Sequence, residues 1–94
     1  MSKYAKRVDS NHAEIRDYMR ELGIWVKDTS SYGNGFSDLI VVHKQEPYFI
    51  EIKADKKAKL TPQEREFKER VGNRYHVVVT KEDVNKLFGI KICK

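Results

Sequence analysis

A chain of 94 residues, of which 39% are hydrophobic, has enough apolar surface for one compact core and not for two. Its 19 Lys and Arg residues against 14 Asp and Glu give a formal net charge of +5, a basic balance that favours polyanionic partners. The single cysteine excludes an internal disulfide framework and a multi-cysteine zinc site. No apolar run approaches the roughly 20 residues that span a membrane. We therefore expect one domain over residues 1–94, located in the cytoplasm.

The first part of the chain predicts a helix, a strand and a loop. Apolar residues recur at helical spacing from Asn11 to Leu22, with Asn11 as the N-cap and Gly23 after the last turn. A short strand, Ile24–Thr29, follows. The glycines and small polar residues of Ser30–Gly35 indicate a loop.

A β-hairpin is the simplest interpretation of the next segment. The β-branched run Leu39–Val42 predicts a buried strand, Lys44–Pro47 a turn, and Tyr48–Lys53 a second strand. Side chains alternate between the two faces of a strand. In the second strand we therefore expect one face to carry Tyr48, Ile50 and Ile52, and the other to carry Phe49, Glu51 and Lys53.

The remaining residues predict helix, strand, helix. Thr61 is an N-cap, Pro62 lies in the first turn, and the helix runs to about Val71. Another strand, Tyr75–Val79, precedes a short helix, Glu82–Phe88. The expected fold class is α/β, a mixed β-sheet flanked by helices in the order αβββαβ(α).

Two carboxylates stand at an informative spacing. Ser37-Asp38 is followed by twelve residues and then by Glu51-Ile52-Lys53. An Asp at the start of one hairpin strand and a Glu in its neighbour bring two carboxylates together. Two such carboxylates repel each other unless a proton or a cation lies between them, so we expect them to bind a divalent cation such as Mg²⁺. The carbonyl of Ile52 could be a further oxygen ligand.

This group of residues suits phosphodiester hydrolysis. The reaction needs an activated water, a stabiliser of charge on the phosphate and help for the leaving oxygen. Divalent metal held by Asp38 and Glu51 supplies all three. The ammonium of Lys53, on the same strand face as Glu51, would lie beside the phosphate and either orient the water or balance charge.

Three segments carry a resemblance to a known family. Gly35-Phe36-Ser37-Asp38, then Phe49-Ile50-Glu51-Ile52-Lys53, then Leu60-Thr61-Pro62-Gln63-Glu64, follow a helix that bears Glu14. This order resembles the VRR-NUC (virus-type replication-repair nuclease) family of the PD-(D/E)XK superfamily. The resemblance implies a restriction-endonuclease-like core and a stand-alone nuclease domain of the phage or bacterial type. It places the protein in the cytoplasm of a bacterial cell or a phage-infected host.

The resemblance also implies a set of site residues and partners. Glu14, Asp38 and Glu51 would hold Mg²⁺ or Mn²⁺, and stand-alone members resemble dimeric Holliday junction resolvases, which implies a homodimer acting on branched DNA. Ser37 replaces the usual Pro before the Asp. Members carry Gln two places after the Pro of the second helix; here Gln63 is one place after and Glu64 two places after. The capping box already gives Glu64 a structural role, so we expect Gln63 to reach the site.

Other interpretations remain open for several residues. Glu14 lies three residues after Asn11, where a capping-box glutamate stands, and this alone would explain it. Lys56, Lys57 and Lys59 form either a solvated connection or DNA backbone contacts, and we favour the contacts. Among the aromatic residues we expect Tyr32 to touch DNA, and we expect core packing for Trp25, Phe49, Phe67 and Phe88.

The sequence thus predicts a Mg²⁺- or Mn²⁺-dependent DNA endonuclease with Asp38, Glu51, Lys53 and Gln63 as catalytic residues. Recognition is expected to rest on DNA shape and phosphate contacts. One alternative is a non-catalytic DNA-binding module of the same fold, which would bind DNA without cutting it. A second is a nuclease that acts on linear DNA ends or on RNA.

Overall fold

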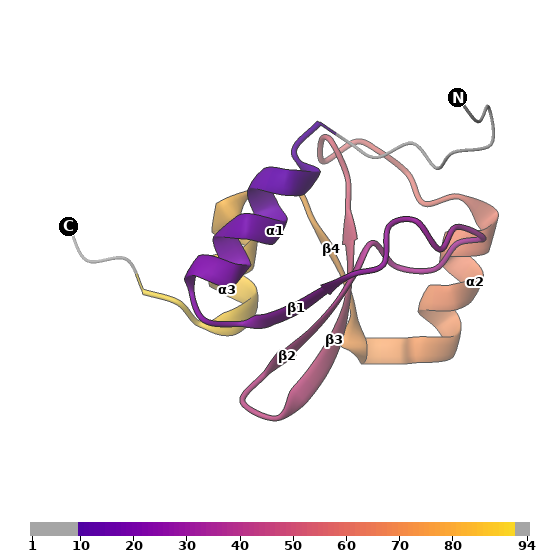
Figure 1. Cartoon of the computed structure of the whole chain (residues 1–94). Helices are drawn as coiled ribbons and strands as arrows, with labels where there is room; N and C mark the ends of the chain where they lie inside the picture. The colour runs from indigo at the N-terminus through magenta and orange to yellow at the C-terminus, as the bar shows by residue number, and fades with distance from the viewer. Residues whose placement is uncertain (1–9, 92–94) are drawn as a thin grey trace.

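The structure, a computed structural model, describes residues 10–91. The elements in chain order are α1 (His12–Glu21), β1 (Trp25–Asp28), β2 (Leu39–His43), β3 (Glu46–Ile52), α2 (Pro62–Val71), the 3₁₀ turn η1 (Gly72–Arg74), β4 (Tyr75–Val78) and α3 (Lys81–Phe88). The strands form one four-stranded sheet in the order β1-β2-β3-β4. Helices α1 and α3 lie on one side of it and α2 lies on the other (Figure 1). The expected order and mixed α/β class are confirmed, and the arrangement is compatible with a restriction-endonuclease-like core.

The sheet is mixed because its strands are connected in two ways. β1, β2 and β3 are antiparallel neighbours, joined by short connections within the sheet. β4 runs parallel to β3, and the chain reaches it by crossing over through α2. None of the helices formed by residues 10–91 is long and apolar enough to cross a membrane.

The hairpin between β2 and β3 has a tighter turn than the sequence predicted. Lys44 and Gln45 both have positive φ, 53° and 69°, as in two-residue turns whose twist matches the flanking strands. Glu46 and Pro47 therefore already belong to β3, where Pro47 stands opposite Val42. The expected turn, Lys44–Pro47, was too long because neither central residue is the Gly or Asn that usually marks this turn.

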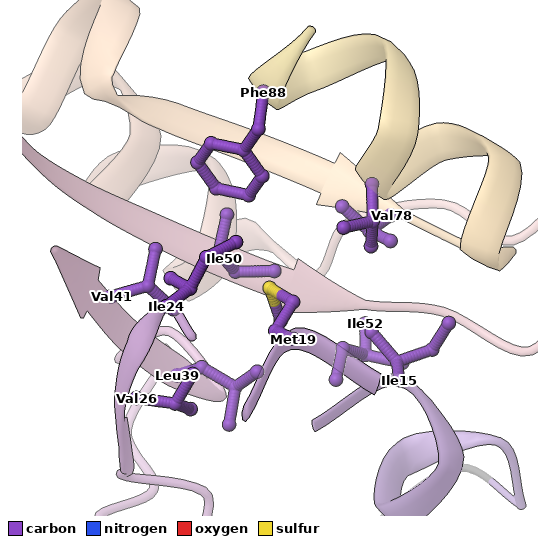
Figure 2. Close-up of a cluster of buried hydrophobic side chains, with 11 residues drawn as sticks. Ile15, Met19, Ile24, Val26, Leu39, Val41, Ile50, Ile52, Val78 and Phe88 are labelled. Carbon is purple, nitrogen blue, oxygen red and sulfur yellow. The ribbon is translucent and has the colours of Figure 1, made fainter. Parts of the chain in front are cut away.

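The predicted alternation along β3 is confirmed. Ile50 and Ile52 are buried in the core against α1 and α3 (Figure 2). Tyr48 packs on Phe88 of α3 with ring centroids 5.1 Å apart. The core cluster consists of Ile15, Met19, Ile24, Val26, Leu39, Val41, Ile50, Ile52, Val78, Val84 and Phe88.

The other face of the sheet carries a smaller aromatic cluster. The ring of Phe67, on α2, lies 5.4 Å from that of Phe49 and 4.9 Å from that of Phe36, in the loop before β2. This cluster holds α2 over the face that bears Glu51. Trp25, on β1, is 58% exposed and packs in neither cluster. The expectation that Trp25 belongs to the core was therefore wrong.

Helix α1 is fixed to the sheet by a charged contact as well as by its apolar face. Asp28, at the end of β1, accepts hydrogen bonds from His12 at 3.1 Å and from Arg16 at 3.0 Å. The same carboxylate accepts from the backbone N–H and hydroxyl of Ser30. Burial opposes ionisation, but these hydrogen bonds hold the pKa of Asp28 well below its usual range.

Candidate active site

Asp38 is held against β3 by its side chain. The register pairs Leu39 with Ile50, so the preceding residue, Asp38, comes next to the position of Glu51 across the hairpin. Its Oδ2 accepts a hydrogen bond of 2.8 Å from the backbone N–H of Ile52, and its backbone carbonyl accepts from Thr29. The buried Asp38 carboxylate therefore lies beside the main chain of Ile52, at the strand position next to Glu51.

Glu51 is a buried carboxyl group with an unused oxygen. It is 2% exposed, and its Oε1 has no hydrogen-bond partner among the residues that the structure describes. Burial, followed by the neighbouring charges of Asp38 and Glu64, raises the pKa of Glu51 to about 9. At neutral pH this carboxyl group keeps its proton unless a cation takes the proton's place.

Lys53 extends from the end of β3 between two carboxylates. Its Nζ lies 2.8 Å from Oε1 of Glu64 and 3.7 Å from Oε2 of Glu51. Glu64, on the first turn of α2, also accepts from the backbone N–H of Thr61 with the same Oε1, at 2.9 Å. Burial alone would raise the pKa of Glu64, but the hydrogen bonds from Lys53 and Thr61 outweigh burial and lower it.

The α2 residue that contacts Lys53 is Glu64, whereas the sequence analysis favoured Gln63. Gln63 is exposed, and its backbone lies against Gly35 in the loop before β2. The third position of a helix directs a capping glutamate back toward the N-cap, here Thr61, and this direction also leads to Lys53. The capping role of Glu64 therefore brings it into the site and does not exclude it.

Glu14 lies apart from this group. Its side chain is 61% exposed and stands 3.8 Å from Nζ of Lys81, on α3, where the two residues line a cavity of about 280 Å³. The rotation of α1 about its own axis is set by Ile15 and Met19, whose side chains face the core. Glu14 consequently points along the edge shared with α3, and the structure does not bring it together with Asp38 and Glu51.

Asn11 has a role that the sequence did not indicate. It occupies the N-cap position of α1, but its side chain makes no capping hydrogen bond. Instead its Nδ2 donates to the carbonyls of Lys53 at 3.0 Å and Val79 at 2.7 Å. Asn11 thus ties together the ends of β3 and β4, beside Lys53. An Asn before a helix is so often a cap that no local signal separates the two roles.

The residues predicted to contact DNA are exposed in the loops before β2 and before α2. Lys56, Lys57 and Lys59 are exposed in the connection between β3 and α2. Lys56 forms an ion pair of 2.7 Å with Asp83, whereas within residues 10–91 no ion pair is formed by Lys57 or Lys59. Tyr32 is 54% exposed and its ring stacks on Phe36 at 5.5 Å.

The charges of the site fit a divalent cation. Asp38, Glu51 and Glu64 place three carboxyl groups around the single ammonium of Lys53. No three Asp, Glu, His or Cys side chains in the described part of the chain are arranged to hold a metal by themselves. Because Lys53 pairs with Glu64, the groups that would be left to hold a cation are Asp38, Glu51 and the main chain of Ile52. Mg²⁺ commonly takes one or two carboxylates and completes its octahedron with water and phosphate.

A comparison with known protein families gives a match over most of the chain. The family model described as the C-terminal domain of the protein NO VEIN matches residues 11–90. No curated protein and no solved structure matches the chain. The description of the matching family names neither an activity nor a substrate, so the resemblance to VRR-NUC nucleases stays a prediction.

Proposed function

The chain belongs to the family of the protein NO VEIN C-terminal domain, and we propose that it is a metal-dependent nuclease that hydrolyses the phosphodiester backbone of DNA. The observation that carries this proposal is the buried Glu51 carboxyl group, with an unpartnered oxygen, beside Asp38 and Lys53. A buried polar atom without a partner destabilises the fold, and in a native protein it points to a functional role or a bound ion.

Each residue has a separate task in this proposal. Mg²⁺ or Mn²⁺, when bound, supplies an activated water and stabilises charge on the phosphate. Asp38 and Glu51 would hold it, and the Ile52 carbonyl would be a third protein donor. Lys53 keeps its ammonium at the site because Glu64 fixes Nζ at 2.8 Å, and it balances charge that develops on the phosphate. Asn11 holds the main chain of Lys53 in place by donating a hydrogen bond to its carbonyl.

The proposed substrate is DNA, with branched DNA favoured. A net charge of +5 and the exposed Lys57 and Lys59 next to Lys53 in sequence support phosphate contacts. The described residues form few elements beyond the sheet and the helices that pack on it, so recognition of DNA shape and phosphates is the simpler mode. We include in the same proposal that the chain is related to the VRR-NUC nucleases and that it works in the cytoplasm of a bacterial or phage-infected cell.

A homodimer is proposed as the active form. Trp25 and Val42 are cross-strand partners on β1 and β2, and they are 58% and 36% exposed. Adjacent exposed apolar side chains of this kind are typical of association surfaces. Sedimentation of the protein and of Trp25→Ser would test this, since the substitution should shift a dimer toward monomer and leave a monomer unchanged.

The proposal is tested by cleavage of a labelled four-way junction and a matched linear duplex, with Mg²⁺, Mn²⁺ or EDTA. We expect metal-dependent cutting by the wild type and by Lys86→Ala, an exposed lysine of α3, and none by Lys53→Ala. Thermal unfolding of each variant checks that it is folded. Binding of both DNAs without cutting, under every metal condition, would favour the non-catalytic module. Cutting confined to duplex ends or to RNA would favour the other alternative.

A further inference from the structure

Tyr75 is a buried residue on the same face as the proposed site. It is the first residue of β4 and pairs with Phe49, while Val77 pairs with Glu51. Side chains alternate along both strands, so Tyr75, Phe49 and Glu51 share one face of the sheet. The ring of Tyr75 packs on Phe67 of α2, with centroids 6.0 Å apart, and the residue is 5% exposed.

The Tyr75 hydroxyl lies beside the carboxyl groups of the site without completing a hydrogen bond. Within the described part of the chain, the Tyr75 hydroxyl and Glu51 Oε1 are both buried side-chain atoms that lack a partner. Tyr75 interacts electrostatically with Glu51, Glu64 and Asp38, so its hydroxyl lies close to these carboxyl groups. A tyrosine hydroxyl carries its proton at neutral pH and can donate it in a hydrogen bond.

This arrangement is costly in a protein that has only to fold. Each buried polar group left without a partner destabilises the folded state, because it has lost its hydrogen bonds to water. A phenylalanine at position 75 would pack on Phe67 in the same way and would carry no such penalty. Unsatisfied donors and acceptors that stand together in a native protein point to a partner or a rearrangement that functions there.

We propose that Tyr75 is a positioning residue whose hydroxyl donates a hydrogen bond to the Glu51 carboxylate and holds it in the orientation that binds the divalent cation. A carboxylate oxygen has two lone pairs, so Oε1 can accept from Tyr75 and still face a cation. Its other oxygen, Oε2, is already oriented by Lys53 at 3.7 Å. Together Lys53 and Tyr75 would fix both ends of the carboxylate. The inference rests on the metal site of the proposed function.

The test measures Mn²⁺ affinity directly, by calorimetric titration of the metal-free protein without DNA. Hydrogen-bond partners of metal ligands typically contribute 10- to 100-fold to affinity, so Tyr75→Phe should bind Mn²⁺ at least about tenfold more weakly. The matched control is Tyr48→Phe, whose ring packs against Phe88 on the opposite face and which should bind Mn²⁺ as the wild type does.

Two further readouts separate positioning from a structural role. The metal-free Tyr75→Phe protein should be as stable as the wild type or more stable, because the substitution removes an unpartnered buried hydroxyl. Its kcat on DNA should fall while KM stays the same. If the variant loses stability and keeps its Mn²⁺ affinity, Tyr75 is structural and the inference is wrong.

The outcomes also distinguish this inference from the function on which it rests. A wild type that binds Mn²⁺ and cuts no DNA would overturn the nuclease proposal, and the affinity of Tyr75→Phe would still decide the role of Tyr75. A wild type that binds no Mn²⁺ would overturn both. Equal Mn²⁺ affinities of the wild type and Tyr75→Phe would overturn the inference alone.

Discussion

Glu64 combines two roles in a single carboxylate oxygen. Its Oε1 accepts from the backbone N–H of Thr61, which caps α2, and from Nζ of Lys53, which belongs to the site. Its backbone N–H in turn donates to the Thr61 hydroxyl at 3.1 Å. The start of α2 and the position of the Lys53 ammonium are therefore coupled through one residue.

Substitution of Glu64 should therefore affect both stability and activity. Glu64→Ala removes the partner of Lys53 and half of the capping box, so we expect kcat to fall by about 10- to 100-fold and stability by about 1 kcal/mol. Gln63→Ala is the matched control, because Gln63 is exposed and should leave both unchanged. Nuclease assays and urea unfolding of the two variants decide the matter. If Gln63→Ala lost activity and Glu64→Ala did not, Gln63 would be the site residue, as the sequence analysis expected.

Glu51 is expected to be a residue kept for function at the expense of stability. Glu51→Gln removes a buried group that must take up a proton in the metal-free fold. We therefore expect the metal-free variant to be more stable than the wild type by about 1–3 kcal/mol at neutral pH, and to cut no DNA. Denaturant unfolding in EDTA measures the first effect. A destabilised Glu51→Gln protein would show that the carboxyl group has a structural role instead.

At the scale of elements, the loop before β2 and the start of α2 form one unit. Phe36 packs on Phe67, and Gly35 lies so close to α2 that a Cβ added there would come within 2.6 Å of the Gln63 main chain. The loop leads into Asp38, and α2 begins just before Glu64. Contact between the two elements therefore sets the distance between the carboxylates that they carry.

Gly35→Ala tests this unit, with Gly33→Ala as the control. Both glycines have positive φ, +82° and +73°, so alanine strains the backbone at either position by roughly 1 kcal/mol. Only Gly35 has an additional clash with Gln63, since nothing lies within 4 Å of a Cβ at Gly33. We expect Gly35→Ala to lower the thermal midpoint and the Mn²⁺ affinity more than Gly33→Ala does. Equal effects in the two variants would contradict a close loop–helix contact.

At the scale of the whole molecule, the basic excess is only partly free to bind a polyanion. Several cationic side chains are engaged with carboxylates on the protein itself: Arg16 with Asp28, Lys56 with Asp83, Arg70 with Glu66, Arg74 with Glu46 and Lys81 with Glu14. The exposed pairs among them add little stability, but all of these pairs reduce the charge offered to DNA. Of the lysines that follow β3, this leaves Lys57 and Lys59.

The salt dependence of DNA binding should report this difference. The double substitution of Lys57 and Lys59 by alanine is expected to reduce the slope of log K against log salt concentration by about 1–2, because each phosphate contact contributes about 0.9. Lys56→Ala should have a smaller effect, since Lys56 already pairs with Asp83. Fluorescence anisotropy at several salt concentrations measures the slopes. Equal slopes for the wild type and the double variant would place the DNA elsewhere.

The stability of the metal-free protein should depend on pH in two opposite ways. The pKa of Glu51 is raised to about 9. The stability that the protonated Glu51 carboxyl group contributes is therefore fully present below the usual pKa of a glutamate and is lost as pH rises toward 9. Burial opposes ionisation of Asp83, but its hydrogen bonds, first that from Lys56, lower the pKa to about 2. The contribution of Asp83 is therefore present above about pH 4 and is lost as pH falls.

We therefore expect metal-free stability to decline between about pH 5 and pH 9, by at most about 1.4 kcal/mol per pH unit. Glu51→Gln should remove this decline and keep the loss at acid pH. Denaturant unfolding in EDTA across this range measures both. A wild-type profile that stays flat over the same interval would show that Glu51 ionises normally in the fold.

The local pattern of the sequence determined most of the fold. The period of two along β3 separated Ile50 from Glu51, and the capping residue Thr61 defined the start of α2, because these features depend on neighbours in the chain. The spacing of Asp38 and Glu51 predicted a carboxylate pair for the same reason: both lie on one hairpin, whose register the strands fix. The tight turn at Lys44-Gln45 was missed because neither residue favours positive φ.

Tertiary packing decided which remaining residues join the pair. Glu64, Asn11 and Tyr75 reach the site from elements far apart in the chain, and their positions depend on how α2, α1 and β4 dock on the sheet. Glu14 is directed away because the phase of α1 is set by the apolar side chains that it buries. A sequence specifies contacts within a hairpin or a helix turn directly, whereas contacts between elements follow from packing of the whole core.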